Sequence, residues 1–243
     1  MAATKPNLKI TVTSDLACPW CYVGLRRLDK ALARMPEVKA DKEWHAFLLD
    51  WGAHASGLPI QEALAKKFGS QGEQIMQRIF NAGRPDGADF ANWKWRANTV
   101  KGHMLVALAR RYGKSHEANE LLFLKSYETG ENISDTDVIL DVGRQLGLPE
   151  EELQASFGSG GLDEGLLKEV QQSDTFAKQE LRVSGVPYFR ISCNGGKAIA
   201  LSGAQPPEAF QEAIQRVLKE AGHADASDGT PNAGGASTGA GCA

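Results

Sequence analysis

The sequence predicts an α/β fold in which a βαβ unit and a ββα unit flank a long all-helical block. Three observations carry this expectation. Alternating, β-branched segments occur near both ends of the chain, apolar residues recur at helical spacing between them, and Pro and Gly residues separate the segments. With 243 residues, of which 42% are hydrophobic and 23% are charged, the chain can bury a full core.

The N-terminal segments predict the βαβ unit. Residues 8–13 alternate apolar and polar side chains, which indicates a strand. Pro19 then suits the first turn of a helix, whose apolar residues continue at helical spacing until Pro36. Residues 44–51 are expected to form a second strand that is buried on both faces. A strand, a helix and a strand of this length imply a right-handed parallel crossover.

The middle of the chain is expected to be helical. Apolar residues at three- and four-residue spacing predict helices at 61–68, 72–82, 100–112, 117–129, 136–146 and 166–181. The Gly-rich residues 157–165 are expected to form a connector. We assign residues 58–174 to a helical insertion subdomain.

The C-terminal part predicts the ββα unit. Alternating residues and a Gly-rich hairpin turn indicate two strands followed by a helix, at 188–193, 198–201 and from Pro206 to Leu218. Together with the first unit, this part forms one domain, for which we expect residues 6–57 and 175–221. Residues 222–243 are rich in Gly, Ala and Ser and are expected to be a disordered tail.

The composition excludes several classes of partner. The chain has 27 Lys and Arg against 30 Asp and Glu, a net charge of −3, so we expect no nucleic-acid partner. No apolar stretch approaches the roughly 18 residues of a membrane-spanning helix, so we expect no membrane association. The polar start does not resemble a secretory signal, and we expect a cytoplasmic location. The sequence leaves open whether the protein forms a homodimer.

Two of the four cysteines, Cys18 and Cys21, enclose Pro19 and Trp20 at the start of the first predicted helix. Thiols at positions i and i+3 lie on one helix face, close enough to form a disulfide. The positive end of the helix dipole stabilises a thiolate at Cys18 and lowers its pKa. We therefore expect an exposed, attacking Cys18 at the first turn and a resolving Cys21 one turn further in.

Other readings of the cysteines are weaker. A zinc site needs two more ligands, and because no second C-x-x-C or paired His supplies them, we expect no metal. The pair could also be two buried thiols that occur together by coincidence. Cys193 is expected to pack in the core and Cys242 to be an inert thiol of the tail. Asp15 either tunes the pair or caps the turn before it, and we favour the cap.

Four segments in chain order carry a family signature: Ser14-Asp15 with Cys18-Pro19-Trp20-Cys21-Tyr22-Val23-Gly24, Arg96-Ala97-Asn98-Thr99 with Gly102-His103, Ser184-Gly185-Val186-Pro187-Tyr188-Phe189, and Ser202-Gly203-Ala204-Gln205. Together they resemble the DsbA-like thioredoxin superfamily. The branch they resemble most is that of the FrnE-like dithiol–disulfide isomerases, first named from polyketide biosynthesis. The resemblance extends from about residue 8 to residue 221.

The resemblance implies a thioredoxin fold (βαβ…ββα) interrupted by a large helical insertion, as in DsbA. It also implies a cis bond between Val186 and Pro187 that faces the cysteines, with the Val186 backbone pairing with an extended substrate. The residues expected to contact substrate are Pro19, Trp20, Val186, Pro187, Asn98 and His103. For Asn98 and His103, capping of a helix and a hydrogen-bonded histidine on the helix surface are the favoured alternative.

The leading functional hypothesis is a thiol–disulfide oxidoreductase or isomerase that acts on protein or small-molecule thiols and disulfides. It needs no bound cofactor beyond the redox-active disulfide Cys18–Cys21, and glutathione stays open as a co-substrate. The resemblance also implies an alternative, a glutathione-dependent isomerase or transferase of the 2-hydroxychromene-2-carboxylate isomerase or kappa-class type. Those branches usually carry Ser where Cys18 stands, and Cys21 argues against them. A third hypothesis is a binding module without catalysis.

Overall fold

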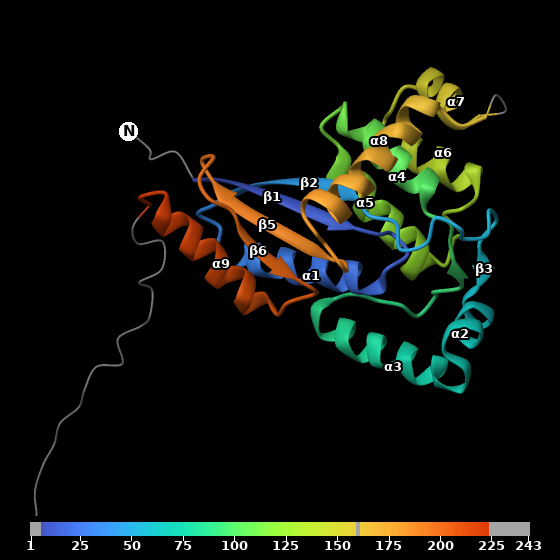
Figure 1. The fold of residues 1–243 in the computed structure, drawn as a ribbon, viewed down its shortest axis with the longest axis horizontal. Coiled ribbons are helices and arrows are strands. Elements are labelled where there is room, and N and C mark those ends of the chain that lie inside the picture. The colour runs from blue at the N-terminus through green and yellow to red at the C-terminus, as the bar shows by residue number, and fades with distance from the viewer. Residues whose placement is uncertain (1–5, 159–160, 224–243) are drawn as a thin grey trace, which may run out of the picture.

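The centre of the protein is a mixed four-stranded sheet with the strand order β2-β1-β5-β6 (Figure 1). In this computed structural model, which describes residues 6–158 and 161–223, β1 (Asn7–Ser14) pairs in parallel with β2 (Lys39–Ala46). On its other side β1 pairs antiparallel with β5 (Tyr188–Cys193), which pairs antiparallel with β6 (Ile199–Ser202). The thioredoxin fold expected for the chain is therefore present.

One face of the sheet forms the main core. The alternation of β1 places Leu8, Ile10 and Val12 on this face, directly opposite Cys193, Ile191 and Phe189 of β5, and all six are buried. Helices α1 (Pro19–Ala33) and α9 (Pro207–Glu220) cover it, and the Phe189 and Phe210 rings meet edge to face at 4.8 Å. The expectation that Cys193 packs in the core is confirmed.

The prediction for the second strand was wrong in its position and its burial. Strand β2 ends at Ala46, and because it is an edge strand, only Trp44 and Ala46 of its residues are buried. Beyond the end of β2, two carboxylates accept hydrogen bonds from backbone N–H groups. Leu48 N donates to Asp174 Oδ1 at 2.8 Å and Leu49 N to Asp15 Oδ2 at 2.9 Å. These side-chain acceptors replace a strand partner, which an apolar run alone does not reveal.

Most of the elements between β2 and β5 are helices, as expected. They are α2 (Ile60–Phe68), α3 (Gly72–Gly83), α4 (Val100–Arg110), α5 (Ser115–Phe123), α6 (Thr136–Gln145), α7 (Glu150–Phe157) and α8 (Glu164–Thr175). Short 3₁₀ turns follow α2 and α3, at Gly69–Gln71 and Arg84–Asp86. Helix α7 was not predicted, nor was the small antiparallel sheet of β3 (Leu58–Pro59) and β4 (Trp95–Arg96), between which α2 and α3 lie in the chain. Two long predicted helices end instead in π-helical segments, at Leu124–Thr129 and Phe176–Glu180.

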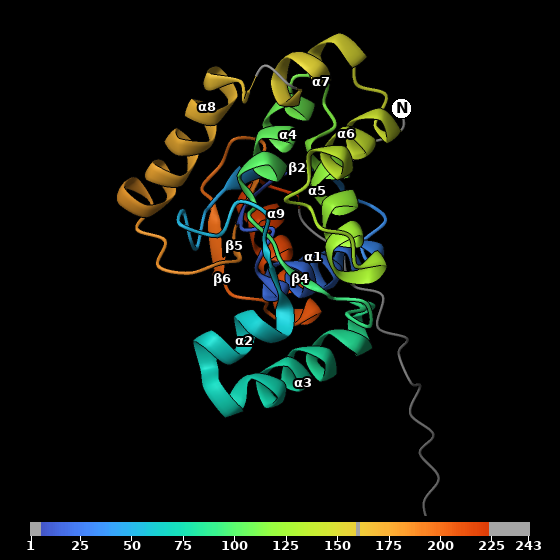
Figure 2. The same cartoon turned by 90° about the vertical axis from the view of Figure 1, so that its right-hand side faces the viewer.

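The helices form two groups. The pair α2 and α3 lies apart from α4 to α8, with the start of α1 between the two groups (Figures 1 and 2). Arg27 of α1 holds the end of α3 in place, because its guanidinium pairs with Asp86 at 2.7 Å and donates to the Ala82 and Ala204 carbonyls. Since these contacts join α1, α3 and the loop after β6, they fix the position of the α2–α3 pair relative to Cys18.

An aromatic cluster joins α1 to the other group of helices. The Tyr22 ring lies 5.4 Å from that of Phe123 and 5.7 Å from that of Tyr127, and Phe90 packs against both tyrosines. Tyr22 Oη also donates a hydrogen bond to Glu128. The start of α1 is therefore supported from both sides.

Among the described residues, no helix is both long and apolar enough to cross a bilayer. The division into a domain of residues 6–57 and 175–221 with an insertion at 58–174 stays a prediction. The tail expected at 222–243 lies almost entirely outside the described residues, as does Cys242.

Candidate active site

The turn between β1 and α1 places Cys18 at the amino end of α1. Cys18 is the N-cap residue, with extended dihedral angles (φ −98°, ψ 110°), and Pro19 is the first helical residue. The Cys21 N–H donates to the Cys18 carbonyl at 2.9 Å, which closes the first turn. The thiol of Cys18 therefore lies at the positive end of the helix dipole, where a thiolate is stabilised.

The two thiols have opposite pKa shifts. A hydrogen bond from the Cys21 thiol lowers the pKa of Cys18 below its ordinary value; burial and the charge of Asp15 oppose this, and the backbone N–H groups of Cys21 and Trp20 add to it. Burial, followed by the hydrogen bond with Cys18 and its charge, raises the pKa of Cys21 well above its ordinary value. The proton is thus retained by Cys21, and Cys18 is the thiol that ionises.

Cys18 is less accessible than predicted. It is only 7% exposed and Cys21 only 1%, so the expected exposed position of Cys18 was wrong. The reason is the loop before β5, where the Val186 carbonyl oxygen accepts a hydrogen bond from Cys18 Sγ at 3.6 Å. The Val186–Pro187 bond in this loop is cis. The loop approaches α1 closely at Gly24, where a Cβ would lie 3.0 Å from Pro187 Cγ.

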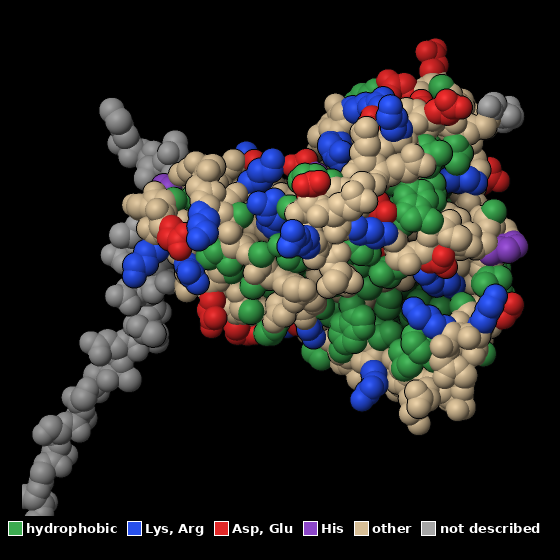
Figure 3. All heavy atoms as spheres, in the orientation of Figure 1, with side chains coloured by type: hydrophobic (Ala, Val, Ile, Leu, Met, Phe, Trp, Pro, Cys, Tyr) green, Lys and Arg blue, Asp and Glu red, His purple; other side chains and the backbone are tan. Residues whose placement is uncertain are grey.

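Access to Cys18 is through a cavity of about 220 Å³ between the start of α1 and the α2–α3 pair. Its lining is largely apolar and includes Pro19, Trp20, Ile60, Leu64, Ile75 and Ile79. Figure 3 shows hydrophobic side chains gathered where the α2–α3 pair meets the rest of the molecule. Cys18 lines this cavity and Cys21 does not, so a ligand in the cavity meets Cys18 first.

Comparison with known proteins agrees with this geometry, since the DSBA-like thioredoxin domain matches residues 9–215. The chain belongs to this family. It is 26% identical over 215 residues, 88% of this chain and 99% of the other, to the uncharacterized protein YwbO of Bacillus subtilis. A probable DsbA oxidoreductase of Streptomyces coelicolor superposes with a TM-score of 0.74 at 25% identity, covering 88% of this chain and 91% of that one.

More distant structures share the fold of this DsbA-like protein. The cytosolic disulfide reductase DsbM of Pseudomonas aeruginosa, also solved with GSH, has a TM-score of 0.59 at 19% identity, covering 87% of this chain and 99% of its own. A 2-hydroxychromene-2-carboxylate isomerase has a TM-score of 0.63 at 12% identity, covering 88% and 98%. A disulfide reductase and a 2-hydroxychromene-2-carboxylate isomerase therefore both have this architecture.

Behind the cysteines, the DsbA-like protein buries a carboxylate. Asp15 is 1% exposed and accepts hydrogen bonds from Ala17 N at 3.0 Å, Leu49 N at 2.9 Å and Thr99 Oγ1 at 2.8 Å, while His103 Nε2 lies 3.4 Å away. Burial alone raises the pKa of this carboxyl, but the hydrogen bond and charge of His103 and the two backbone amides lower it below its ordinary value. Asp15 caps the turn, as favoured, and its charge also raises the pKa of Cys18.

Asn98 and His103 do not line the cavity that contains Cys18. Asn98 Oδ1 accepts from Val100 N at 3.1 Å and its Nδ2 donates to the Ala53 carbonyl at 2.9 Å, so it caps α4 and holds a loop. The expectation that His103 lies on the helix surface was wrong, because its side chain is buried beside Asp15. Substrate contact by either residue stays a prediction.

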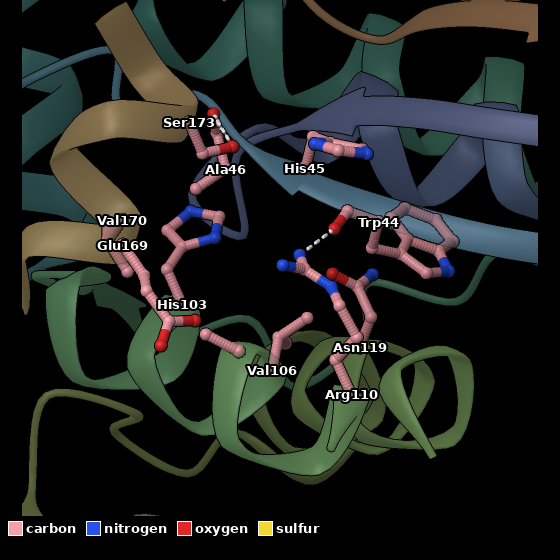
Figure 4. A pocket seen from close by; sticks show the side chains of 11 residues that line it. Trp44, His45, Ala46, His103, Val106, Arg110, Asn119, Glu169, Val170 and Ser173 are labelled. Carbon is pink, nitrogen blue, oxygen red and sulfur yellow. Dashed lines mark hydrogen bonds between the residues drawn. The ribbon is translucent and has the colours of Figure 1, made fainter. Parts of the chain in front are cut away.

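His103 instead lines a second, much smaller cavity between α4, α8 and β2 (Figure 4). Its volume is about 10 Å³, which is about the space of one water molecule. Arg110 donates there to the Trp44 carbonyl at 2.6 Å, while Asn119 Nδ2 and Arg110 Nε have no hydrogen-bond partner among the described residues. This cavity is too small for a substrate.

In the described part of the chain, no cluster of three or more His, Cys, Asp or Glu side chains could hold a metal ion. The reactive groups at this site are the two thiols, and the groups that act on them are the backbone N–H groups at the start of α1 and Asp15. The sequence identified both thiols, Pro19, Trp20 and the Val186–Pro187 bond. It did not identify the apolar side chains of α2 and α3 as part of the site, because their spacing predicts helices but not what the helices face.

The low pKa of Cys18 leads to a direct test. We expect iodoacetamide to alkylate Cys18 in the native, reduced protein at lower pH than it alkylates a free thiol, whose pKa is roughly 8.5. Site-resolved mass spectrometry should show Cys193, which is 2% exposed and whose pKa burial raises, unmodified under the same conditions. If the alkylation rate of Cys18 depended on pH in the same way as that of free cysteine, Cys18 would not have a lowered pKa, and its assignment as the attacking thiol would be contradicted.

Proposed function

We propose that this DsbA-like protein is a thiol–disulfide oxidoreductase or isomerase in which Cys18 attacks and Cys21 resolves. The observation that carries the proposal is the asymmetry of the pair. Cys18 lines the apolar cavity and has a lowered pKa, while Cys21 lies behind it with a raised pKa. A low-pKa thiol with access to ligand and a protonated thiol in reserve is the arrangement that sequential exchange needs.

The exchange proceeds in two balanced steps. The Cys18 thiolate attacks a substrate disulfide, so that a Cys18–substrate S–S bond forms, the substrate S–S bond breaks, and one substrate thiolate leaves and takes up a proton. Cys21 then loses its proton and attacks Cys18 Sγ, which releases the second substrate thiol. The protein dithiol loses two electrons and the substrate disulfide gains them. Run in reverse, the same steps oxidise a substrate dithiol.

The groups around Cys18 support substrate binding during these steps. Pro19 and Trp20 line the cavity, and the Val186 carbonyl, 3.6 Å from Cys18 Sγ, is oriented toward the reacting sulfur. We propose that the Val186 backbone pairs with an extended substrate segment beside Cys18 when the substrate is a protein. Glutathione is proposed as a co-substrate that returns the pair to its starting state. A cytoplasmic location and a homodimer stay predictions.

Trapping of a covalent intermediate tests this proposal. We expect Cys21→Ser, incubated in its reduced form with native insulin or glutathione disulfide, to accumulate a mixed disulfide on Cys18, because the attack that resolves it is lost. Intact-mass measurement under non-reducing conditions detects the adduct, and peptide mapping locates it. Wild-type protein should give only the internal Cys18–Cys21 disulfide.

The same experiment separates the alternative functions. A glutathione-dependent isomerase or transferase needs no resolving thiol, so its turnover would survive Cys21→Ser unchanged. A binding module without catalysis would form no adduct at Cys18. Either outcome contradicts the proposed exchange mechanism.

A further inference from the structure

The cavity beside Cys18 is apolar, but it is not neutral. Among the described residues that line it, the charged side chains other than the Cys18 thiolate are Lys67 of α2 and Arg96 of β4, and both are cations. The remaining lining consists mainly of aliphatic and aromatic side chains from α1, α2, α3 and Trp93. A cavity with an apolar lining and two cations near the reactive thiolate favours a ligand with an apolar body and an anionic group.

Neither cation has a carboxylate partner among residues 6–158 and 161–223. In the part of the chain that the structure describes, no carboxylate lies within ion-pair distance of Lys67 or Arg96. Arg96 Nη1 donates a long hydrogen bond of 3.4 Å to the Ala97 carbonyl, and Lys67 Nζ lies 5.2 Å from the Phe68 ring centre. By contrast, Arg26 and Arg27 of the neighbouring helix are each paired with a carboxylate.

The apolar lining also extends to the surface. Trp20 is 38% exposed, Leu49 49% and Phe68 36%, and all three line this cavity. Large apolar side chains grouped around an opening mark a surface that binds something apolar. The volume of about 220 Å³ exceeds the roughly 150 Å³ of an apolar cavity that holds benzene. One aromatic ring with a short substituent is therefore of suitable size.

From these observations we propose that the site selects small disulfides and thiols that combine an apolar, aromatic body with an anionic group, which Arg96 and Lys67 bind while the sulfur meets Cys18. The proposal rests on the proposed function, because it names the substrate class of the same site. The exchange steps are those given above, with the small disulfide reduced to two thiols as the protein dithiol is oxidised. The two cations also offset the repulsion between an anionic ligand and the Cys18 thiolate.

A series of disulfides tests the selectivity. The reduced protein is mixed with an anionic aromatic disulfide (dithiobis-nitrobenzoate), a neutral aromatic one (dithiodipyridine), a cationic aliphatic one (cystamine) and glutathione disulfide. Each rate is divided by the rate of the same reagent with free cysteine, which removes differences in intrinsic reactivity. We expect the largest ratio for the anionic aromatic disulfide and the smallest for cystamine. Glutathione disulfide, which lacks an apolar body, should fall between them.

Variants of the two cations assign the selectivity to residues. We expect Arg96→Gln to lower the ratio for the anionic aromatic disulfide about tenfold and to leave the ratio for the neutral one unchanged. Arg96→Lys should restore most of the loss. Lys67→Glu, at an exposed position that folding tolerates, should lower the anionic ratio about threefold or more and raise that of cystamine. The matched control is Lys66→Gln, because Lys66 is the adjacent cation of α2 and does not line the cavity.

The outcomes distinguish this proposal from the function on which it rests. The proposed substrate class is wrong if the wild type gives equal rate ratios for the anionic and the neutral aromatic disulfide. It is also wrong if Lys67→Glu and Arg96→Gln leave the preference for the anionic over the neutral disulfide unchanged. Disulfide exchange itself stands in both cases. A protein disulfide such as insulin with a larger ratio than all four small disulfides also overturns it and assigns the cavity to peptide segments. Undiminished exchange of every disulfide by Cys18→Ser would instead overturn the proposed function.

Discussion

Replacement of Cys18 by Ser is expected to abolish disulfide exchange, with a loss of roughly 1,000-fold or more in the rate of insulin reduction. A serine hydroxyl does not ionise at neutral pH, so the hydrogen bond from Cys21 and the backbone N–H groups at the start of α1 have no anion to stabilise. Because the Val186 carbonyl and the cavity remain in place, the loss should appear in the chemical step and not in folding. Thermal unfolding should change little.

The matched control is Cys193→Ala. Cys193 is also a buried thiol, but it lies on β5 opposite Leu8, in the core beneath α1 and α9. Its replacement is expected to lower stability somewhat, through a small cavity, and to leave the exchange rate unchanged. Full insulin reduction by Cys18→Ser, or a comparable loss of activity in Cys193→Ala, would contradict the assignment of Cys18 as the attacking thiol.

The second large effect is expected at Asp15. In Asp15→Ala, the N–H groups of Ala17 and Leu49, the buried Thr99 hydroxyl and the buried His103 ring all lose their acceptor. Removal of one partner from such a buried polar cluster costs about 3–5 kcal/mol. For a chain of this size, the midpoint of thermal unfolding should fall by roughly 10 °C. Circular dichroism during heating measures the shift.

The pH dependence of this contribution has a definite sign. The pKa of Asp15 is lowered in the folded protein, so its stabilisation is present above the unfolded value of roughly 3.9 and is lost as the pH falls through the folded value. The difference in stability between the wild type and Asp15→Asn should therefore be constant near neutrality and shrink in acid. The pKa of Cys18 should be lower still in Asp15→Asn, because the charge of Asp15 raises the pKa of Cys18 in the wild type.

Asp89→Ala is the control for this prediction. Asp89 makes the same local contact, with Oδ1 accepting from Ala91 N at 2.9 Å two residues on, but it lies on the surface. Its loss should cost less than about 1 kcal/mol. Equal shifts for the two variants would show that the turn contact alone, and not the buried cluster with Thr99 and His103, carries the stabilisation.

The local patterns of the sequence predicted most of the elements and the order in which they occur. Alternation in 8–13 and 188–193 and the Gly-rich turn between the last strands were reliable, because each feature depends on neighbours in the chain. The strand at 39–46 was placed too late because it is an edge strand in which polar residues predominate, and the apolar run after it packs in a loop. Edge position is a tertiary property that a short pattern does not contain.

The site was predictable in its sulfur chemistry and not in its surroundings. Cys18, Cys21 and the Val186–Pro187 bond were found from spacing and from the family resemblance. The cavity, by contrast, brings Trp20 together with α2, α3 and β4, which are tens of residues away in the chain. The unpaired charges of Lys67 and Arg96 are likewise visible only once the absence of nearby carboxylates can be checked among the described residues.

The separate origins of the reacting sulfur and of the walls around it have a consequence for how this protein can diversify. The thiols belong to a turn that the central sheet supports, whereas most of the walls come from 60–96, a stretch anchored to α1 through Arg27. Substitutions confined to residues 60–96 can change which ligands bind in the cavity without changing the two thiols that carry out disulfide exchange. Exchanging this segment between homologues is therefore a rational way to change substrate specificity while the cysteine pair stays the same.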